Sequence, residues 1–325
     1  MDGVLDFSIG LTEGVAWPWP IAVYLFLAGI SGGALGVILS MTKLRGTSRE
    51  DSPLLKSAAL IALATILLGM VCLVLDLTDP LFFWRILVFY NPTSVMSVGV
   101  MMLLCYIPLT AVLTVIVLRK EFNLVLSFLH MPKLGAFVEK LGEIFNRART
   151  PITWIVLFLA FGICAYTGFL ISALIRYPLI NTAVLPALFV ASGVSAGTAA
   201  AKLVAVAFFG EKMSSENVHL LHKAEYPMMA IEASCIFMIG MAMIFGFAGA
   251  QAAAAAFISG VWAVVFWAGA IGVGFGIPLV LGIAVKGHSP VVFWTTGFCA
   301  VAGMMCLRLF ILYAGQLNSL MLTTI

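Results

Sequence analysis

The chain has 325 residues, of which 63% are hydrophobic and only 10% are charged, and its formal net charge is +3. A soluble domain carries about 25% charged residues, so this composition excludes an ordinary water-soluble fold. It predicts an all-α polytopic membrane protein that contacts the lipid bilayer, and we expect no nucleic-acid partner.

Eight stretches are long and apolar enough to be transmembrane helices, because about 20 helical residues cross the roughly 30 Å of membrane hydrocarbon. They cover approximately residues 19–41, 54–75, 94–118, 152–174, 183–209, 227–247, 257–285 and 291–313. The connections between them are short apart from the third, residues 119–151. The second half of that segment is amphipathic, which predicts a helix on the membrane surface.

The first span begins with the sequence WPWPIAVYLFLAGISGG at residues 17–33. Tryptophan favours the headgroup level of a membrane, and proline suits the first turn of a helix. Small residues from Gly29 to Gly36 let another helix approach closely. We therefore expect this stretch to fix the depth and the packing of the first span.

Lysine and arginine are concentrated in the loops that follow the first, third, fifth and seventh spans, whereas the opposite side carries only Arg85 and Arg176. Because these residues resist translocation, the basic loops are expected in the cytoplasm. Both termini are then outside, which agrees with an even number of spans.

Two short sequences recur in the same order and direction. SGVSAG at residues 192–197 matches AGISGG at 28–33 in residue size, and YTGFLIS at 166–172 resembles YAGQLNS at 313–319. Small residues recur in many membrane helices, but duplication accounts for both matches. It predicts two parallel four-helix units. The first unit comprises residues 1–118 and 152–174. Residues 119–151 form the cytoplasmic loop, and residues 183–325 form the second unit.

Ionisable residues within spans are costly and therefore mark candidate sites. One group is expected near the outer ends of the spans: Tyr24, Asp76, Tyr166, Arg176 and Arg308. A carboxylate, phenols and arginines at similar depth suit the binding of a polar ring at the membrane edge, or proton exchange. The alternatives are an Asp76–Arg308 ion pair, an interfacial anchor for Tyr24, and an Arg176 that reaches to water.

A second polar group is expected on the cytoplasmic side, where His222, Glu225 and Glu232 occupy the sixth span and its approach. Glu225 and Glu232 are seven residues apart and so share a helix face, which suits a proton relay. The alternative is an ion pair between Lys202 and a glutamate that joins the fifth and sixth spans.

Redox centres held by this chain are not expected. The four histidines lie in or beside predicted cytoplasmic loops, so no pair faces across the membrane to ligate a b-type haem. The six cysteines show no CxxC spacing that would ligate an iron–sulfur cluster.

Seven motifs resemble the membrane subunits of the NrfD/polysulfide-reductase family over nearly the whole chain, and they look nearest to the NrfD branch. They are WPWPIAVYLFLAGISGG, LDLTDPLFFWR, NPTSVMSVGVM, CAYTGFLISAL, RYPLIN, LPALFVASGVSAG and LRLFILYAGQ. The resemblance implies a quinone-reactive subunit of a respiratory complex in the bacterial cytoplasmic (inner) membrane, without haem or iron–sulfur cluster. Asp76 of LDL and Tyr166 of YTG match polar quinone-site positions of the family. Tyr24 stands where some members have histidine, and Asp79 where relatives commonly have arginine.

The resemblance implies oxidation of menaquinol or ubiquinol near the outer face. Electrons would pass to a periplasmic four-cluster iron–sulfur protein and then to a molybdenum or multihaem catalytic subunit, of the nitrite- or polysulfide/thiosulfate-reductase type. The residues expected to contact the quinol are Tyr24, Asp76, Tyr166, Arg176 and Arg308, with Asp76 as proton acceptor. A cytoplasmic proton route would use His222, Glu225 and Glu232. The rival functions are a transporter or channel built on the repeat, and a passive membrane anchor.

Overall fold

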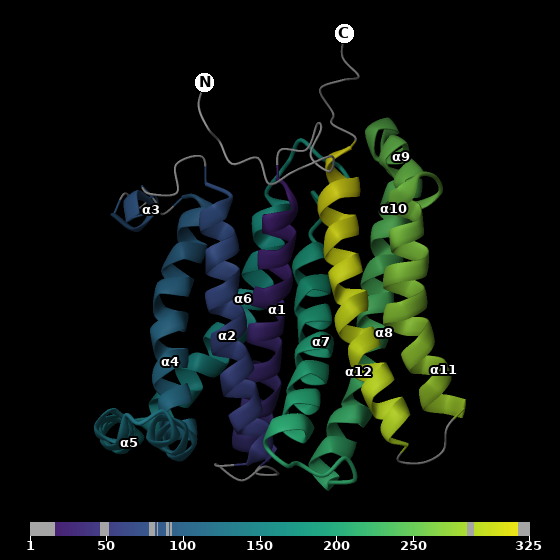
Figure 1. Cartoon of the computed structure of the whole chain (residues 1–325). Helices are drawn as coiled ribbons and strands as arrows, with labels where there is room; N and C mark the ends of the chain where they lie inside the picture. The colour runs from purple at the N-terminus through teal and green to yellow at the C-terminus, as the bar shows by residue number, and fades with distance from the viewer. Residues whose placement is uncertain are drawn as a thin grey trace.

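The computed structural model describes residues 17–45, 52–77, 82, 84–88, 91, 93–284 and 289–317. Regular structure in this part of the chain is entirely helical, and eight helices are long and apolar enough to cross a membrane. They run side by side along one direction (Figure 1). The expected all-α fold with eight spans is therefore confirmed.

The helical elements follow one another along the chain with short connections. In order they are α1 (Trp19–Ser40), η1 (Met41–Arg45), α2 (Pro53–Leu75), α3 (Trp84–Val88), α4 (Val95–Phe128), α5 (Pro132–Asn146), α6 (Arg149–Ser172), α7 (Leu185–Phe208), α8 (Glu216–Ile244), α9 (Ala248–Ala254), η3 (Ala255–Phe257), α10 (Val261–Val264), η4 (Val265–Gly276), α11 (Ile277–Ala284), α12 (Pro290–Leu309) and η5 (Phe310–Ala314). The turns η1, η4 and η5 are π-helical and η3 is a 3₁₀-helix. The seventh span is built from α10, η4 and α11, and the eighth from α12 and η5.

Two helices are longer than the sequence predicts. Helix α4 continues ten residues past the expected end, to Phe128, and α8 begins at Glu216 instead of residue 227. Hydropathy detects only the part of a helix that suits hydrocarbon, and both helices continue into polar sequence. The Ser215 hydroxyl accepts a hydrogen bond from the Val218 N–H (3.4 Å) and so caps the start of α8.

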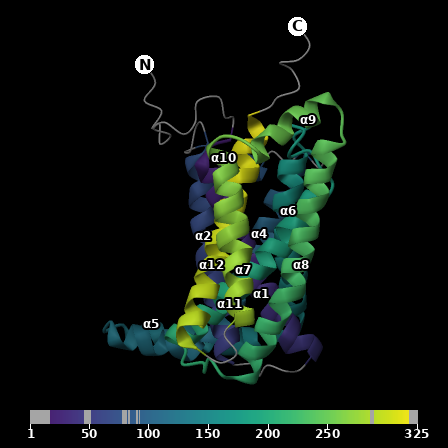
Figure 2. The ribbon, with the colours of Figure 1, turned by 90° about the vertical axis from the view of Figure 1, so that its right-hand side faces the viewer.

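The described residues begin and end at the same end of the bundle. The Trp17 N–H donates to Gln316 Oε1 (2.9 Å), and Gln316 Nε2 donates to the Trp17 carbonyl oxygen (3.1 Å). We call this the Trp17 end. Helix α5 lies across the opposite end, which we call the α5 end (Figure 1, Figure 2).

Helices α1 and α7 form the central seam of the bundle (Figure 1). A Cβ added to Gly33 would lie 1.8 Å from the Gly193 carbonyl oxygen, and one added to Gly197 would lie 2.3 Å from the Ala34 nitrogen. Only glycine fits at such distances, and glycines spaced four apart are typical of closely packed membrane helices. The two segments that the sequence predicts to be repeats therefore pack against each other.

The remaining long helices flank this seam on two sides. Helix α1 contacts α2 and α6, and both of these contact α4. Helix α7 contacts α8 and α12, and α12 contacts η4 and α11. Across the seam, α7 also touches α2 and α6.

Helix α5 is the amphipathic helix expected in the third connection. Gly142 and Gly135 lie close against α4, and Asn123 Nδ2 donates to Glu139 Oε2 (2.5 Å). Its other side exposes large apolar residues such as Phe137. A helix of this kind suits the interface between headgroups and acyl chains.

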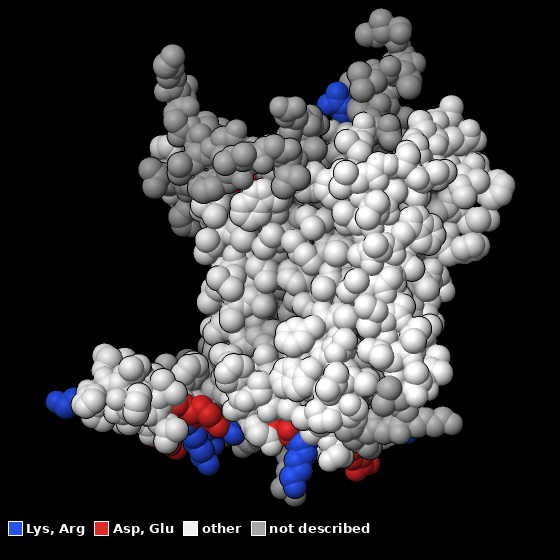
Figure 3. All heavy atoms as spheres, turned by 45° about the vertical axis from the view of Figure 1, so that its right-hand side comes forward, with Lys and Arg blue, Asp and Glu red and all other residues white. Residues whose placement is uncertain are grey.

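On the face of the bundle that Figure 3 shows, described charged side chains avoid the middle of the surface. In Figure 3 lysine, arginine and glutamate gather at the α5 end, while the band between the two ends shows none. An uncharged band is what membrane hydrocarbon requires.

Candidate functional site

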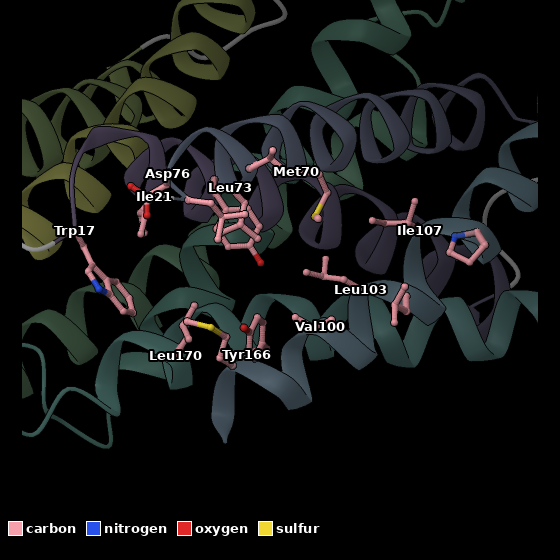
Figure 4. A pocket seen from close by; sticks show the side chains of 16 residues that line it. Trp17, Ile21, Met70, Leu73, Asp76, Val100, Leu103, Ile107, Tyr166 and Leu170 are labelled. Atoms are coloured by element: carbon pink, nitrogen blue, oxygen red, sulfur yellow. The ribbon is translucent and has the colours of Figure 1, made fainter. Parts of the chain in front are cut away.

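A cavity of about 380 Å³ lies between α1, α2, α4 and α6, toward the Trp17 end. Its wall is mostly aliphatic. Figure 4 shows Trp17 near one end of the lining side chains and Ile107 near the other, with Asp76 and Tyr166 on the Trp17 side. The cavity is therefore elongated, with polar groups toward one end.

Three of the residues expected near the outer ends of the spans line this one cavity: Tyr24 of α1, Asp76 after α2, and Tyr166 of α6. Trp17 also lines it, so the opening stretch of the first span forms part of the wall. Tyr24 and Tyr166 are only 1% and 6% exposed. The structure brings these residues together from three separate spans.

The Tyr24 hydroxyl is buried and has no hydrogen-bond partner among the described residues. A buried hydroxyl without a partner costs about 1–3 kcal/mol. A polar group of a ligand in the cavity would supply the missing bond. The donor set thus fits a mostly apolar ligand that carries a hydroxyl or carbonyl oxygen.

Asp76 ends α2 and is half-buried at the rim of the cavity. Burial raises the pKa of its carboxyl from 3.8 to about 6. A carboxyl with that pKa exchanges protons readily near neutral pH, which is what a proton acceptor needs. The neighbouring Asp79 lies outside the described residues.

Two glycines make room for the tyrosines. A Cβ on Gly99 of α4 would lie 1.6 Å from Cζ of Tyr166, and one on Gly69 of α2 would lie 3.3 Å from Cδ2 of Tyr24. The Tyr166 ring therefore lies directly on the α4 backbone. Neither glycine was expected from the sequence to belong to the site, although glycine inside an apolar helix signals a close approach.

Arg308 is not part of the cavity and is not paired with Asp76. Its side chain is fully buried between α12 and α7, where Nη2 donates to Ser192 Oγ (2.8 Å) and to the Phe189 carbonyl oxygen (3.2 Å). The guanidinium carbon lies 3.5 Å from the centre of the Phe189 ring. Arg176 is exposed in the connection between α6 and α7 and does not line the cavity either.

The second predicted group lies at the α5 end, on the α7 and α8 side. Lys202 of α7 forms an ion pair with Oε1 of Glu225 of α8, and His222 Nδ1 lies 3.0 Å from Glu225 Oε2. The structure therefore contains the Lys202–Glu ion pair that is the alternative to a relay. A cavity of about 80 Å³ opens beside Lys202 and His222.

Glu232 lies two turns further along α8, and its carboxylate is buried. It lines a small space together with Ser192 of α7, the residue to which Arg308 donates. Arg308 Nε and Nη1 have no hydrogen-bond partner among the described residues. The arginine expected at the outer site therefore belongs with the Glu232 group instead.

Among the described residues, no group of three or more histidine, cysteine, aspartate or glutamate side chains is placed to hold a metal ion. All six cysteines are free thiols.

Comparisons with known proteins agree over the length of the chain. The family model described as "Polysulphide reductase, NrfD" matches residues 8–319. The C subunit of the polysulfide reductase of Wolinella succinogenes is 40% identical over 95% of this chain and 97% of its own length. The NrfD homolog of Haemophilus influenzae is 37% identical over 97% of this chain and 99% of its own, and NrfD of Escherichia coli 36% over 94% and 96%. These identities do not separate the NrfD branch from the polysulfide-reductase branch.

Proposed function

Because the chain belongs to the NrfD polysulphide-reductase family, we propose that it is the quinol-oxidising membrane subunit of a respiratory oxidoreductase complex. It is a multi-pass protein of the bacterial inner membrane. The observation that carries the proposal is the cavity that joins Tyr24, Asp76 and Tyr166 within an apolar wall.

The shape of the cavity suits a quinol, which has a polar ring and an apolar isoprenoid tail. The ring lies on the side of Trp17, Asp76 and Tyr166, where hydroxyl and carboxylate groups are available (Figure 4). The tail follows the aliphatic wall toward Leu103 and Ile107. Menaquinol and ubiquinol share these two parts, and either is a substrate under this proposal.

Oxidation of one quinol to quinone releases two electrons and two protons. Asp76 accepts a proton from a ring hydroxyl and passes it to water on the outer side, and the second proton leaves to the same side. The phenols of Tyr24 and Tyr166 hold the ring oxygen in place by hydrogen bonds. The electrons leave to a periplasmic four-cluster iron–sulfur protein docked at the Trp17 end. That protein passes them to a molybdenum or multihaem catalytic subunit.

The proposal includes a topology. Both termini lie outside, and the basic connections, including residues 119–151, lie in the cytoplasm. Residues 1–118 and 152–174 form one four-helix unit and residues 183–325 its parallel repeat. The glycine motifs of α1 and α7, which match in sequence and meet at the seam, support this arrangement.

The proposed terminal acceptor rests on the names of the relatives. One relative is a polysulfide reductase subunit and two are NrfD proteins. We propose a complex of the nitrite- or polysulfide/thiosulfate-reductase type. Proton exchange with the cytoplasm would use His222 and Glu225, which lie within one turn of α8, and Glu232, which lies two turns further along the same helix.

The rival functions predict a different site. A transporter binds its substrate near the middle of the membrane, whereas this cavity lies toward one end of the bundle. A passive anchor has no use for a ligand-sized cavity with a buried hydroxyl that lacks a partner.

The test is quinol-linked electron transfer in membranes that contain the intact complex. Asp76→Asn and Tyr166→Phe should each abolish it while the complex still assembles. Tyr106→Phe is the matched control. Tyr106 is a buried tyrosine of α4 that does not line the cavity, and its hydroxyl forms a hydrogen bond with Ser31 Oγ of α1 (2.9 Å). Normal turnover in both cavity variants would overturn the proposal.

A further inference from the structure

Gln316, which follows the eighth span, contacts Trp17, which precedes the first span and lines the cavity. Gln316 is 4% exposed, and its side-chain amide makes two hydrogen bonds with the backbone of Trp17. Oε1 accepts from the Trp17 N–H (2.9 Å), and Nε2 donates to the Trp17 carbonyl oxygen (3.1 Å). The amide therefore pairs with Trp17 as a neighbouring strand would.

Trp17 has no helix to hold its backbone. It precedes Pro18, and α1 begins only at Trp19. A residue before proline is restricted to extended conformations, so its N–H and C=O groups need partners from elsewhere. Gln316 supplies both partners, and Trp17 lines the cavity.

Gln316 and the residues just before it make further contacts that hold the side chain in place. Nε2 also donates to the Leu312 carbonyl oxygen (2.8 Å). The preceding π-helical turn η5 is buried, and its Tyr313 ring stacks on Trp262 with centroids 4.8 Å apart at 15°. Gly315 packs against Ile180, where a Cβ would lie 2.4 Å from Cγ2. Short π-helical turns frequently occur at functional sites.

We propose that Gln316 is a positioning residue for the quinol cavity, which fixes Trp17 as the wall against which the quinol ring lies. This inference rests on the proposed function and extends it to the eighth span. The ring site, formed by α1, α2, α4 and α6, is then completed by a residue that follows α12.

The inference predicts a specific kinetic effect. Trp17 neither takes up a proton nor carries an electron in the proposed reaction, so its loss of position weakens binding more than chemistry. Removal of a contact made equally in the ground and transition states raises KM and leaves kcat unchanged. Loss of both hydrogen bonds should raise the KM for quinol about tenfold.

The test uses two variants in the intact complex. Gln316→Leu removes both bonds to Trp17, whereas Gln316→Glu keeps the acceptor for the Trp17 N–H and loses the donor. With a short-chain naphthoquinol as substrate, KM should rise in the order wild type, Gln316→Glu, Gln316→Leu, and kcat should stay within about threefold.

The matched control is Gln251→Leu. Gln251 Nε2 donates to the Gly246 carbonyl oxygen (3.1 Å) near the start of α9, away from the cavity. This variant should keep the wild-type KM. A second readout uses Trp17→Ala: if Gln316 acts through Trp17, Gln316→Leu adds nothing to the KM of the Trp17 variant.

An unchanged KM in assembled Gln316→Leu would overturn the inference, and so would full additivity with Trp17→Ala. If Gln316→Leu does not assemble, an unchanged KM in Gln316→Glu would also overturn the inference. Failure of the proposed function is distinguishable, because it would appear as normal turnover in both Asp76→Asn and Tyr166→Phe.

Discussion

Gly99→Ala tests how the cavity is built. Inside a helix, alanine is normally more stable than glycine by about 0.5–1 kcal/mol, so helix propensity alone favours the change. At this position, however, the added Cβ would lie 1.6 Å from Cζ of Tyr166 and 2.1 Å from its hydroxyl oxygen. The phenol has to leave its place.

The size of the effect follows from that displacement. An ordinary contact is 3.4 Å or longer and the added carbon would lie at 1.6 Å, so the ring must move by about 1.8 Å. A misplacement of about 1 Å can lower an enzymatic rate by about 100-fold, which corresponds to about 2.7 kcal/mol. We therefore expect quinol oxidation to fall at least 100-fold, although Tyr24, Asp76 and Tyr166 are all still present.

The measurement is the rate of quinol oxidation per assembled complex. Gly240→Ala in α8 is the control, because no atom lies within 4 Å of its added Cβ, and it should keep full activity. In a Tyr166→Ala background, which is expected to be inactive, the new methyl group meets no ring, so Gly99→Ala should not lower the yield of assembled complex any further. Activity within twofold of wild type in the Gly99→Ala single variant would refute the packing of Tyr166 on α4.

Two further predictions concern charged groups. The pKa of Asp76 is raised to about 6 and only its carboxylate accepts a proton, so the rate of quinol oxidation should fall as the pH drops through about 6 and level off above it. A flat wild-type profile between about pH 5 and 7 would contradict this role. Lys202→Met leaves the largely buried Glu225 carboxylate beside His222 without its lysine, which should destabilise the subunit by about 3–5 kcal/mol. Addition of Glu225→Gln should restore most of the loss in a detergent-unfolding assay, and an unaffected Lys202→Met variant would show that the pair contributes nothing.

The sequence predicts well how deep a residue lies in the membrane, but it predicts poorly in which direction its side chain points. Hydropathy and interfacial tryptophans place each residue along the membrane normal, which is enough to put Tyr24, Asp76 and Tyr166 at one level. They do not say toward which neighbour a side chain points. Arg308 is the example: its position in the eighth span predicts a depth near Asp76, but it lies between α12 and α7, on the far side of the seam from the cavity.

The sequence does not show which residues of different helices touch, for a similar reason. Gly99 and Gly69 matter through the side chains that their missing Cβ atoms admit, and those side chains belong to other helices. Gln316 and Trp17 are 299 residues apart, and no local pattern connects them. The repeat is the one long-range signal in the sequence, and it does identify two segments that meet.

The glycine seam between α1 and α7 limits how this protein can move. Where backbones touch without side chains between them, there is no compressible layer on which one half could rock or slide over the other. Rigid-body exchange between two halves, the motion on which alternating access depends, is therefore opposed by the close backbone contact between α1 and α7. Conformational change is left to the parts away from the seam. Under the proposed function, a quinol would therefore enter and leave sideways from the bilayer and not through an opening between the halves.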